Sequence, residues 1–155
     1  MKIRYEQGDF VEGWPAWLLH GCNAQGVMGS GAAKAIRSKY PSAYDVYRLQ
    51  YNKGVQQLGT VTLATQPDGR IVFNGITQQY YGRDKKVYVS YNALREVVQA
   101  VDWYAKEHGE GKIYVGMPKI GAGLGGGDWE IISKIIEEES KHFTAVVYEL
   151  GGEKK

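Results

Sequence analysis

The sequence predicts an α/β fold in which a mixed β-sheet is covered by helices on both faces. Short apolar segments typical of buried strands alternate along the chain with segments of helical period. An Asp-Gly turn within residues 66–69 separates two strands and indicates an antiparallel hairpin, so the sheet is mixed. Two glycine-rich loops, at residues 24–33 and 121–127, each follow a predicted strand and precede a predicted helix.

The elements follow from this pattern in chain order. Strands are expected at residues 1–6, 14–23, 59–65, 70–76, 113–117 and 143–150. Helices are expected at residues 34–40, 42–51 and 90–108, and after Asp128. The two longest patterns place apolar side chains on one face, which we expect to pack on the sheet: Tyr91, Leu94, Val97, Val98, Val101, Tyr104 in the first and Ile131, Ile132, Ile135, Ile136 in the second. Residues 137–139 are all glutamate and are expected to form a solvated face.

Composition limits the class of protein. A chain of 155 residues with 43% apolar content predicts one globular domain, at residues 1–150, followed by a charged tail at residues 151–155. No apolar run approaches a membrane span, and the single Cys22 favours a reducing, cytoplasmic setting. A net charge of +2 is too small to indicate a nucleic-acid surface.

The loop at residues 121–127 has the composition of a phosphate cradle. Five of its seven residues are glycine, so its backbone can approach an anion closely, and Asp128 is a good N-cap for the helix that follows. Gly121, Gly123 and Gly126 also match the G-x-G-x-x-G pattern of dinucleotide-binding folds, with Glu149 placed as a ribose-binding acid. That alternative is weak because only about one helix and one strand remain after the loop. A flexible linker is weaker still, because strong apolar elements flank the loop.

Both glycine loops leave the carboxyl end of a strand, so they should meet at one rim of the sheet and suit a ligand with two phosphates. The chain resembles macro domains, the three-layer α/β/α fold that binds ADP-ribose. The matching segments span nearly the whole chain in order: residues 8–10, 22–33, 117–124 and 147–150. Within that family the chain is most similar to the fungal-type ADP-ribose 1″-phosphatases and the related branch that removes ADP-ribose from acidic side chains. The segment HGCNAQGVMGSGAAKAIRSKYP is similar to the phosphatase group.

The resemblance implies a set of binding residues. Asp9 would accept a hydrogen bond from the adenine amino group beside the Phe10 backbone, and Asn23 would hold the distal ribose hydroxyls. The two loops would clasp the diphosphate and the distal ribose. A turn cap is the alternative for Asp9, and a plain turn residue for Asn23. The remaining residues implied in substrate binding are Gln25, Gly26, Met28, Gly29, Ser30, Gly31, Ala32, Ile120, Gly121, Ala122, Gly123, Leu124 and Gly125.

The resemblance also implies a catalytic pair, His20 and Asp84. An imidazole can act as acid or base near neutral pH, and Asp84 lies after a glycine in a loop similar to the one that carries a catalytic acid in the phosphatases. The alternative for His20 is a core histidine satisfied by hydrogen bonds at a strand end. The alternative for Asp84 is a solvated charge among Arg83, Lys85 and Lys86.

The sequence departs from the glutamate-hydrolase branch. That branch has a lysine where this chain has Gln78 and Gln79, and its loop aspartate would fall at Gly125, so a covalent lysine route is not expected. No metal or cofactor is expected, and Cys22 is interpreted as a small buried residue rather than a nucleophile. We therefore predict an enzyme that binds ADP-ribose and hydrolyses ADP-ribose 1″-phosphate. The alternatives are a non-catalytic reader of ADP-ribose or ADP-ribosylated protein, and a hydrolase of ADP-ribosyl or O-acetyl-ADP-ribose groups.

Overall fold

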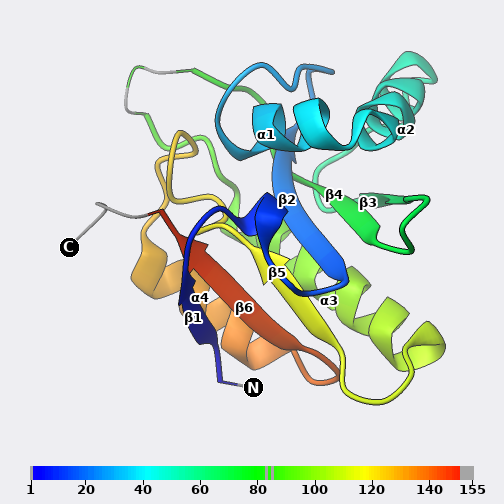
Figure 1. Cartoon of the computed structure of the whole chain (residues 1–155). Coiled ribbons are helices and arrows are strands. Elements are labelled where there is room, and N and C mark those ends of the chain that lie inside the picture. The colour runs from blue at the N-terminus through cyan, green and yellow to red at the C-terminus, as the bar shows by residue number, and fades with distance from the viewer. Residues whose placement is uncertain (1, 83, 85, 151–155) are drawn as a thin grey trace.

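A computed structural model of the chain describes residues 2–82, 84 and 86–150 (Figure 1). The predicted tail and two loop residues, Arg83 and Lys85, lie outside the described residues. In the described part of the chain, six strands form one sheet in the order β1-β6-β5-β2-β4-β3, and only β3 runs antiparallel to its neighbour. The predicted mixed sheet and its hairpin are thus confirmed. The strands are β1 (Arg4–Gln7), β2 (Trp17–Asn23), β3 (Val61–Thr65), β4 (Ile71–Gln78), β5 (Tyr114–Met117) and β6 (Thr144–Glu149).

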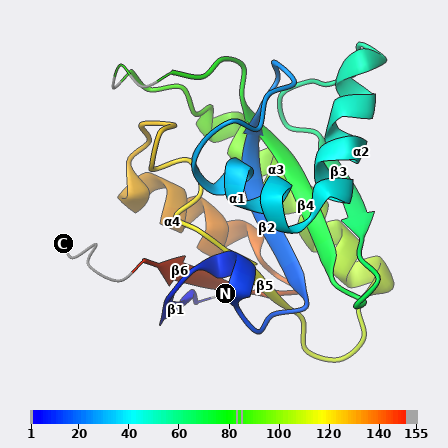
Figure 2. The same cartoon turned by 45° about the horizontal axis from the view of Figure 1, so that its top comes forward.

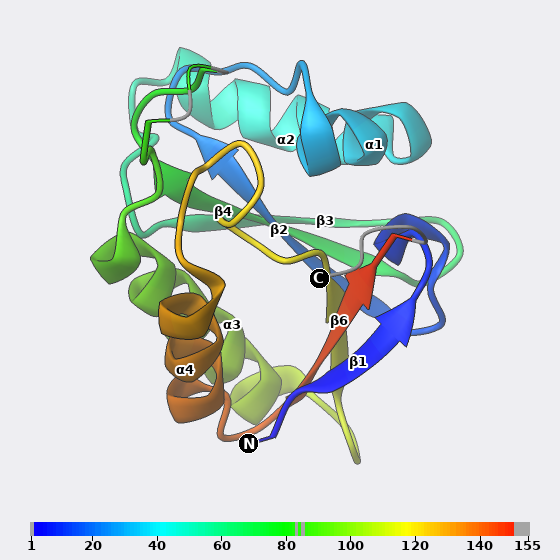
Figure 3. The ribbon, with the colours of Figure 1, turned by 90° about the vertical axis from the view of Figure 1, so that its left-hand side faces the viewer.

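The helices form a layer on each face of the sheet, as predicted (Figure 3). They are α1 (Gly31–Lys39), α2 (Pro41–Asn52), α3 (Tyr91–His108) and α4 (Trp129–Glu139), with a short 3₁₀ turn, η1 (Phe10–Glu12). The first pair, α1 and α2, covers one face, and α3 and α4 cover the other (Figures 1 and 3). No helix in the described part of the chain combines the length and the apolar character needed to cross a membrane.

The larger part of the core lies between the sheet and α3 and α4. Leu94, Val97, Val98 and Val101 of α3 are fully buried there, as their helical spacing predicts. In α4 the predicted stripe is narrower. Ile131 is 44% exposed because it lies about 100° around the helix from the buried Ile132, at the side of the buried face.

The glutamates at the end of α4 are not only a solvated face. Glu138 and Glu139 both accept hydrogen bonds from the Arg95 guanidinium of α3. The side chain of Glu139 is only 14% exposed. These contacts tie α4 to α3, and the sequence pattern alone could not indicate them because Arg95 is distant in the chain.

The first glycine loop is shorter than predicted. Helix α1 begins at Gly31 rather than at residue 34, because Gly31 turns the chain with a φ of +63° and two alanines, good helix formers, follow it. Residues 31–33 are therefore the first turn of a helix. Their N–H groups are the ones that an α-helix leaves without a partner.

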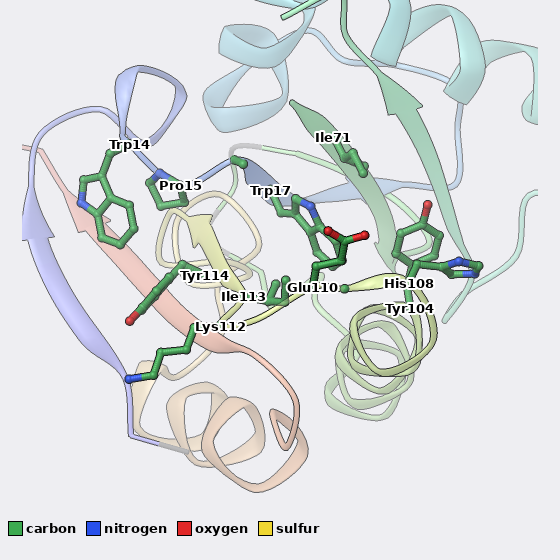
Figure 4. Close-up of a pocket in the computed structure, with 12 residues that line it drawn as sticks. Trp14, Pro15, Trp17, Ile71, Tyr104, His108, Glu110, Lys112, Ile113 and Tyr114 are labelled. Carbon is green, nitrogen blue, oxygen red and sulfur yellow. The ribbon is translucent and has the colours of Figure 1, made fainter. Parts of the chain in front are cut away.

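A small hollow of about 410 Å³ lies at the amino ends of β2, β4 and β5. Four aromatic residues are part of its lining, namely Trp14, Trp17, Tyr104 and Tyr114 (Figure 4). The aromatic rings already pack on one another, with Trp14 edge-on to Tyr114 and Trp17 edge-on to Tyr104. The loops described next lie at the opposite end of the strands.

Candidate ligand-binding cleft

A cleft of about 990 Å³ opens at the carboxyl ends of the parallel strands. Its walls include residues 27 and 29–33, before and within α1, and residues 118–125, after β5. Figure 2 shows these two segments at the same rim of the sheet. A Cβ built on Gly31 would lie 3.7 Å from Leu124 Cδ1, so the two loops nearly touch across the cleft. The prediction that both glycine loops converge at one rim is confirmed.

Backbone amides of both loops are available at this rim. Ser30 caps α1 without a side-chain hydrogen bond, and the first helical bond runs from Lys34 N to Ser30 O, at 3.3 Å. Among the described residues, no partner is found for the N–H groups of residues 31–33 or of residues 123–125. These are the donors that an anion in the cleft could reach.

The amino-terminal end of α4 contributes less to anion binding than the sequence indicates. Asp128 caps the helix as predicted, and its carboxylate accepts the Glu130 N–H at 2.9 Å. Because that carboxylate already occupies the positive end of the helix, α4 offers less to an anion than α1 does. The N-terminal turn of α1 is the helix end that faces the cleft.

The cleft carries little side-chain charge. Among the described residues that line it, only Asp9 and Lys119 are charged at neutral pH. Lys119 is paired with Glu149 at 2.9 Å, which largely neutralises it. An anionic ligand would therefore be held mainly by backbone dipoles.

Asp9 and Tyr148 mark the end of the cleft near β1 and β6. The Asp9 carboxylate caps η1 by accepting the Val11 N–H at 3.2 Å, the alternative that the sequence left open. It also lines the cleft, and a carboxylate has acceptor capacity beyond one cap. Tyr148 lines the same end, and its hydroxyl accepts the Trp14 N–H at 3.3 Å.

Asn23 lies at the other end of the cleft, where β2 stops. Its Oδ1 accepts the Gln25 N–H at 2.8 Å and the Tyr47 hydroxyl at 3.0 Å, and its Nδ2 donates to Val27 O at 2.9 Å. The amide thus closes the turn that begins the first glycine loop. One Nδ2 hydrogen is left over for a ligand.

The structure brings most of the predicted binding residues together, but not all. Gln25, Gly26 and Met28 do not line the cleft. Gln25 donates to Gln79 O at 3.0 Å, Gly26 O accepts from Arg48 at 2.8 Å, and the Met28 side chain is buried under the loop with 1% exposure. The loop folds back onto α2 here, so these residues shape it from below. The predicted residues that do line the cleft are Asp9, Phe10, Asn23, Gly29, Ser30, Gly31, Ala32, Ile120, Gly121, Ala122, Gly123, Leu124 and Gly125.

His20 lies beneath the cleft rather than in its lining. It is fully buried, and its Nε2 lies 2.6 Å from Asn74 Oδ1. Burial lowers the pKa of His20 from 6.5 to about 4, although the Asn74 hydrogen bond opposes this change. The imidazole is therefore neutral at physiological pH. This geometry matches the alternative of a satisfied core histidine, and a catalytic part for His20 stays a prediction.

Asp84 lies on the loop beside the cleft but is not part of its lining, which reaches Tyr81 and Gly82. Its carboxylate accepts the Tyr88 hydroxyl at 2.7 Å and faces Lys86 Nζ at 3.8 Å. The Tyr88 hydrogen bond is the main cause that lowers the pKa of Asp84. The Tyr88 N–H in turn binds Gly125 O at 2.7 Å, which joins this loop to the second glycine loop.

Several lining residues were missed by the sequence analysis. Most are immediate neighbours of predicted residues, and that adjacency was the only signal. Thr77 and Gln78 end β4, while Cys22 lies next to Asn23. Cys22 is 3% exposed and burial raises the pKa of its thiol, which leaves it a poor nucleophile. The missed residues are Gly8, Gly21, Cys22, Ala35, Thr77, Gln78, Gly82, Pro118, Lys119 and Leu150. Val27 and Ala33 of the first glycine loop also line the cleft, as do the aromatic side chains Tyr81 and Tyr148.

Comparison with known proteins identifies the family. The model of the Macro domain family matches residues 19–136, which include both glycine loops. The chain belongs to the macro domain family. A macro domain explains the strand order, the two layers of helices and the cleft at the carboxyl ends of the strands, and it replaces the dinucleotide-reductase alternative.

Two curated proteins and a solved structure resemble this chain along most of its length. An ADP-ribose 1″-phosphate phosphatase of Candida albicans is 28% identical, covering 94% of this chain and 99% of its own. One from Scheffersomyces stipitis is 30% identical, with 94% and 99% covered. A solved structure from Bacteroides thetaiotaomicron, described as a protein of unknown function, superposes with a TM-score of 0.84 at 31% identity, over 96% of this chain and 98% of the other.

A more distant relative has a different name. A DNA ADP-ribosyl glycohydrolase of Thermus aquaticus is 24% identical over 88% of this chain, which spans only 37% of that protein.

Proposed function

We propose that this macro domain binds ADP-ribose and hydrolyses ADP-ribose 1″-phosphate to ADP-ribose and phosphate. The observation that carries the proposal is that both glycine loops line one cleft and carry amides without a partner among the described residues. The diphosphate lies between these amides in the proposal. The relatives named as ADP-ribose 1″-phosphate phosphatases support it, because they match the chain almost end to end.

The two ends of the cleft orient the ligand. Asp9 reads the adenine amino group at the β1 and β6 end, with Tyr148 beside it. Asn23 meets the distal ribose with its remaining amide hydrogen. This orientation places the 1″ phosphate toward Tyr81 and Gly82, on the loop that carries Asp84.

Hydrolysis needs a water oxygen to bond to phosphorus while the bond from phosphorus to the 1″ oxygen breaks and that oxygen gains a proton. Asp84 is ionised at neutral pH, so it can accept the proton of the attacking water once its loop adjusts to bound substrate. The phosphatase resemblance pairs it with His20. We retain His20 in the proposal for that reason and include it in the test.

Phosphate release from ADP-ribose 1″-phosphate tests the proposal. We expect release by the wild type, a large loss in Asp84→Asn and in His20→Gln, and full activity in Asp45→Asn, an exposed aspartate on α2. Calorimetry with ADP-ribose checks that each variant still binds. Activity that survives both substitutions would remove the catalytic pair but leave the binding site.

A non-catalytic ADP-ribose reader is the second candidate function. It is favoured by one observation, namely that neither His20 nor Asp84 lines the cleft. Tight binding of ADP-ribose without phosphate release would establish it. Release of free ADP-ribose from ADP-ribosylated protein and from ADP-ribosylated DNA tests for a glycohydrolase, the activity that names the Thermus aquaticus relative.

A further inference from the structure

One polar group in the cleft has no partner among the described residues. The hydroxyl of Thr77 is buried and makes no hydrogen bond to any of them, although the residue lines the cleft and is only 1% exposed. A buried hydroxyl without a partner destabilises a protein, so native structures rarely keep one without a reason. The smaller hollow at the other end of the strands has no such group among its described lining residues.

The backbone places Thr77 there through an irregularity. Cys22 pairs with Ile76 but Asn23 pairs with Gln78, so Thr77 is the extra residue of a β-bulge between β2 and β4. Bulges redirect side chains and occur often beside active sites. The Thr77 carbonyl accepts the Ser90 N–H at 2.7 Å, which fixes the bulged backbone.

The hydroxyl lies over Gly21 at the floor of the cleft. A Cβ built on Gly21 would lie only 2.7 Å from Thr77 Oγ1 and 3.2 Å from Ile120 Cγ1. Glycine at this position therefore leaves room for the Thr77 hydroxyl. Any larger residue would displace it.

Thr77 belongs to the end of the cleft that lies away from Asp9. It neighbours Gln78 and lies across the bulge from Asn23, the residue assigned above to the distal ribose. We propose that the Thr77 hydroxyl positions the distal end of the ligand by a hydrogen bond to an oxygen of the distal ribose or its 1″ substituent. This inference rests on the proposed function.

The chemistry of the group limits what it can recognise. A hydroxyl donates one hydrogen bond and accepts others, so it suits a sugar hydroxyl or a phosphoryl oxygen. ADP ends at the diphosphate, so it offers neither a distal sugar hydroxyl nor a 1″ phosphoryl oxygen to Thr77. Thr77 thus makes the site favour nucleotides that continue beyond the diphosphate.

Calorimetry with ADP-ribose and with ADP tests the assignment. Thr77→Val removes the hydroxyl and keeps the branched shape. We expect it to weaken ADP-ribose binding about tenfold and to leave ADP binding unchanged. Thr77→Ser keeps the hydroxyl and should keep the preference for ADP-ribose. Thr65→Val, at an exposed position of β3, should change neither affinity.

Thermal unfolding without ligand gives a second readout. Because Thr77→Val removes an unpaired buried hydroxyl, we expect Tm to rise by about 3 °C. A fall in Tm would show that the hydroxyl has a partner in the free protein and would overturn the premise. Equal weakening of ADP and ADP-ribose would assign Thr77 a structural role only, and unchanged affinities would remove it from the site. If the wild type binds neither nucleotide, the proposed function itself fails.

Discussion

Protonation of His20 should make the stability of the fold depend on pH in a defined window. The buried imidazole has a pKa of about 4, against 6.5 in the unfolded chain. Between these values the unfolded chain binds a proton that the folded protein does not. Stability is therefore fully present above pH 6.5 and is lost as the pH falls toward 4.

The size of the effect follows from the shift. Each pKa unit corresponds to about 1.4 kcal/mol, so the complete shift is worth about 3 kcal/mol. Over the upper part of the window, between pH 6.5 and pH 5, the loss should be about 2 kcal/mol. This loss is a sizeable fraction of the free energy of unfolding of a typical domain, which is roughly 5–15 kcal/mol.

Urea unfolding of the wild type and of His20→Gln at pH 7, 6 and 5 measures this loss. The glutamine can still donate to Asn74 but does not titrate, so its free energy of unfolding should fall by about 2 kcal/mol less over the same range. His108→Gln, at an exposed histidine, should retain the wild-type slope. Equal slopes for the wild type and His20→Gln would refute the buried, neutral state of His20.

Three further substitutions test the cleft and the fold. Gly123 has no positive φ, and a Cβ built there meets nothing within 4 Å. The Gly123→Asp variant should therefore fold normally, but it should weaken ADP-ribose binding about a hundredfold because its carboxylate would repel the diphosphate at about 5 Å. Gln57→Asp, on the surface, should leave the affinity unchanged. Calorimetry at low and high salt checks both variants. Cys22→Ser should retain phosphate release, and a complete loss with ADP-ribose binding intact would revive a thiol mechanism. Arg95→Ala should lower the free energy of unfolding by about 1 kcal/mol, measured in urea, because α3 loses its contacts with two glutamates of α4. An unchanged value would show that these two ion pairs contribute nothing to stability.

The parts of the fold that depend on local pattern were predictable. The apolar spacing of α3 and the Asp-Gly turn between β3 and β4 were both interpreted correctly, because each depends on residues close in the sequence. The beginning of α1 was placed three residues late. Glycine usually argues against a helix, but Gly31 here makes the turn into one and the alanines continue it.

Contacts between distant segments decided the rest of the site. Met28 could not be separated from its glycine neighbours by composition, yet its side chain is anchored beneath the loop. His20 stands in a segment typical of phosphatases, but its hydrogen-bond partner, Asn74, is far away in the chain. Thr77 gave no signal at all, since its position depends on a bulge between two strands. Sequence pattern therefore located the two loops, while long-range packing determined which side chains reach the cleft.

A crystal structure of the protein with ADP-ribose tests the central claim most directly. We predict that the diphosphate oxygens lie within about 3 Å of backbone nitrogens in both glycine loops, with the adenine toward Asp9 and the distal ribose toward Asn23 and Thr77. A nucleotide bound elsewhere, or held by only one of the two loops, would contradict the account.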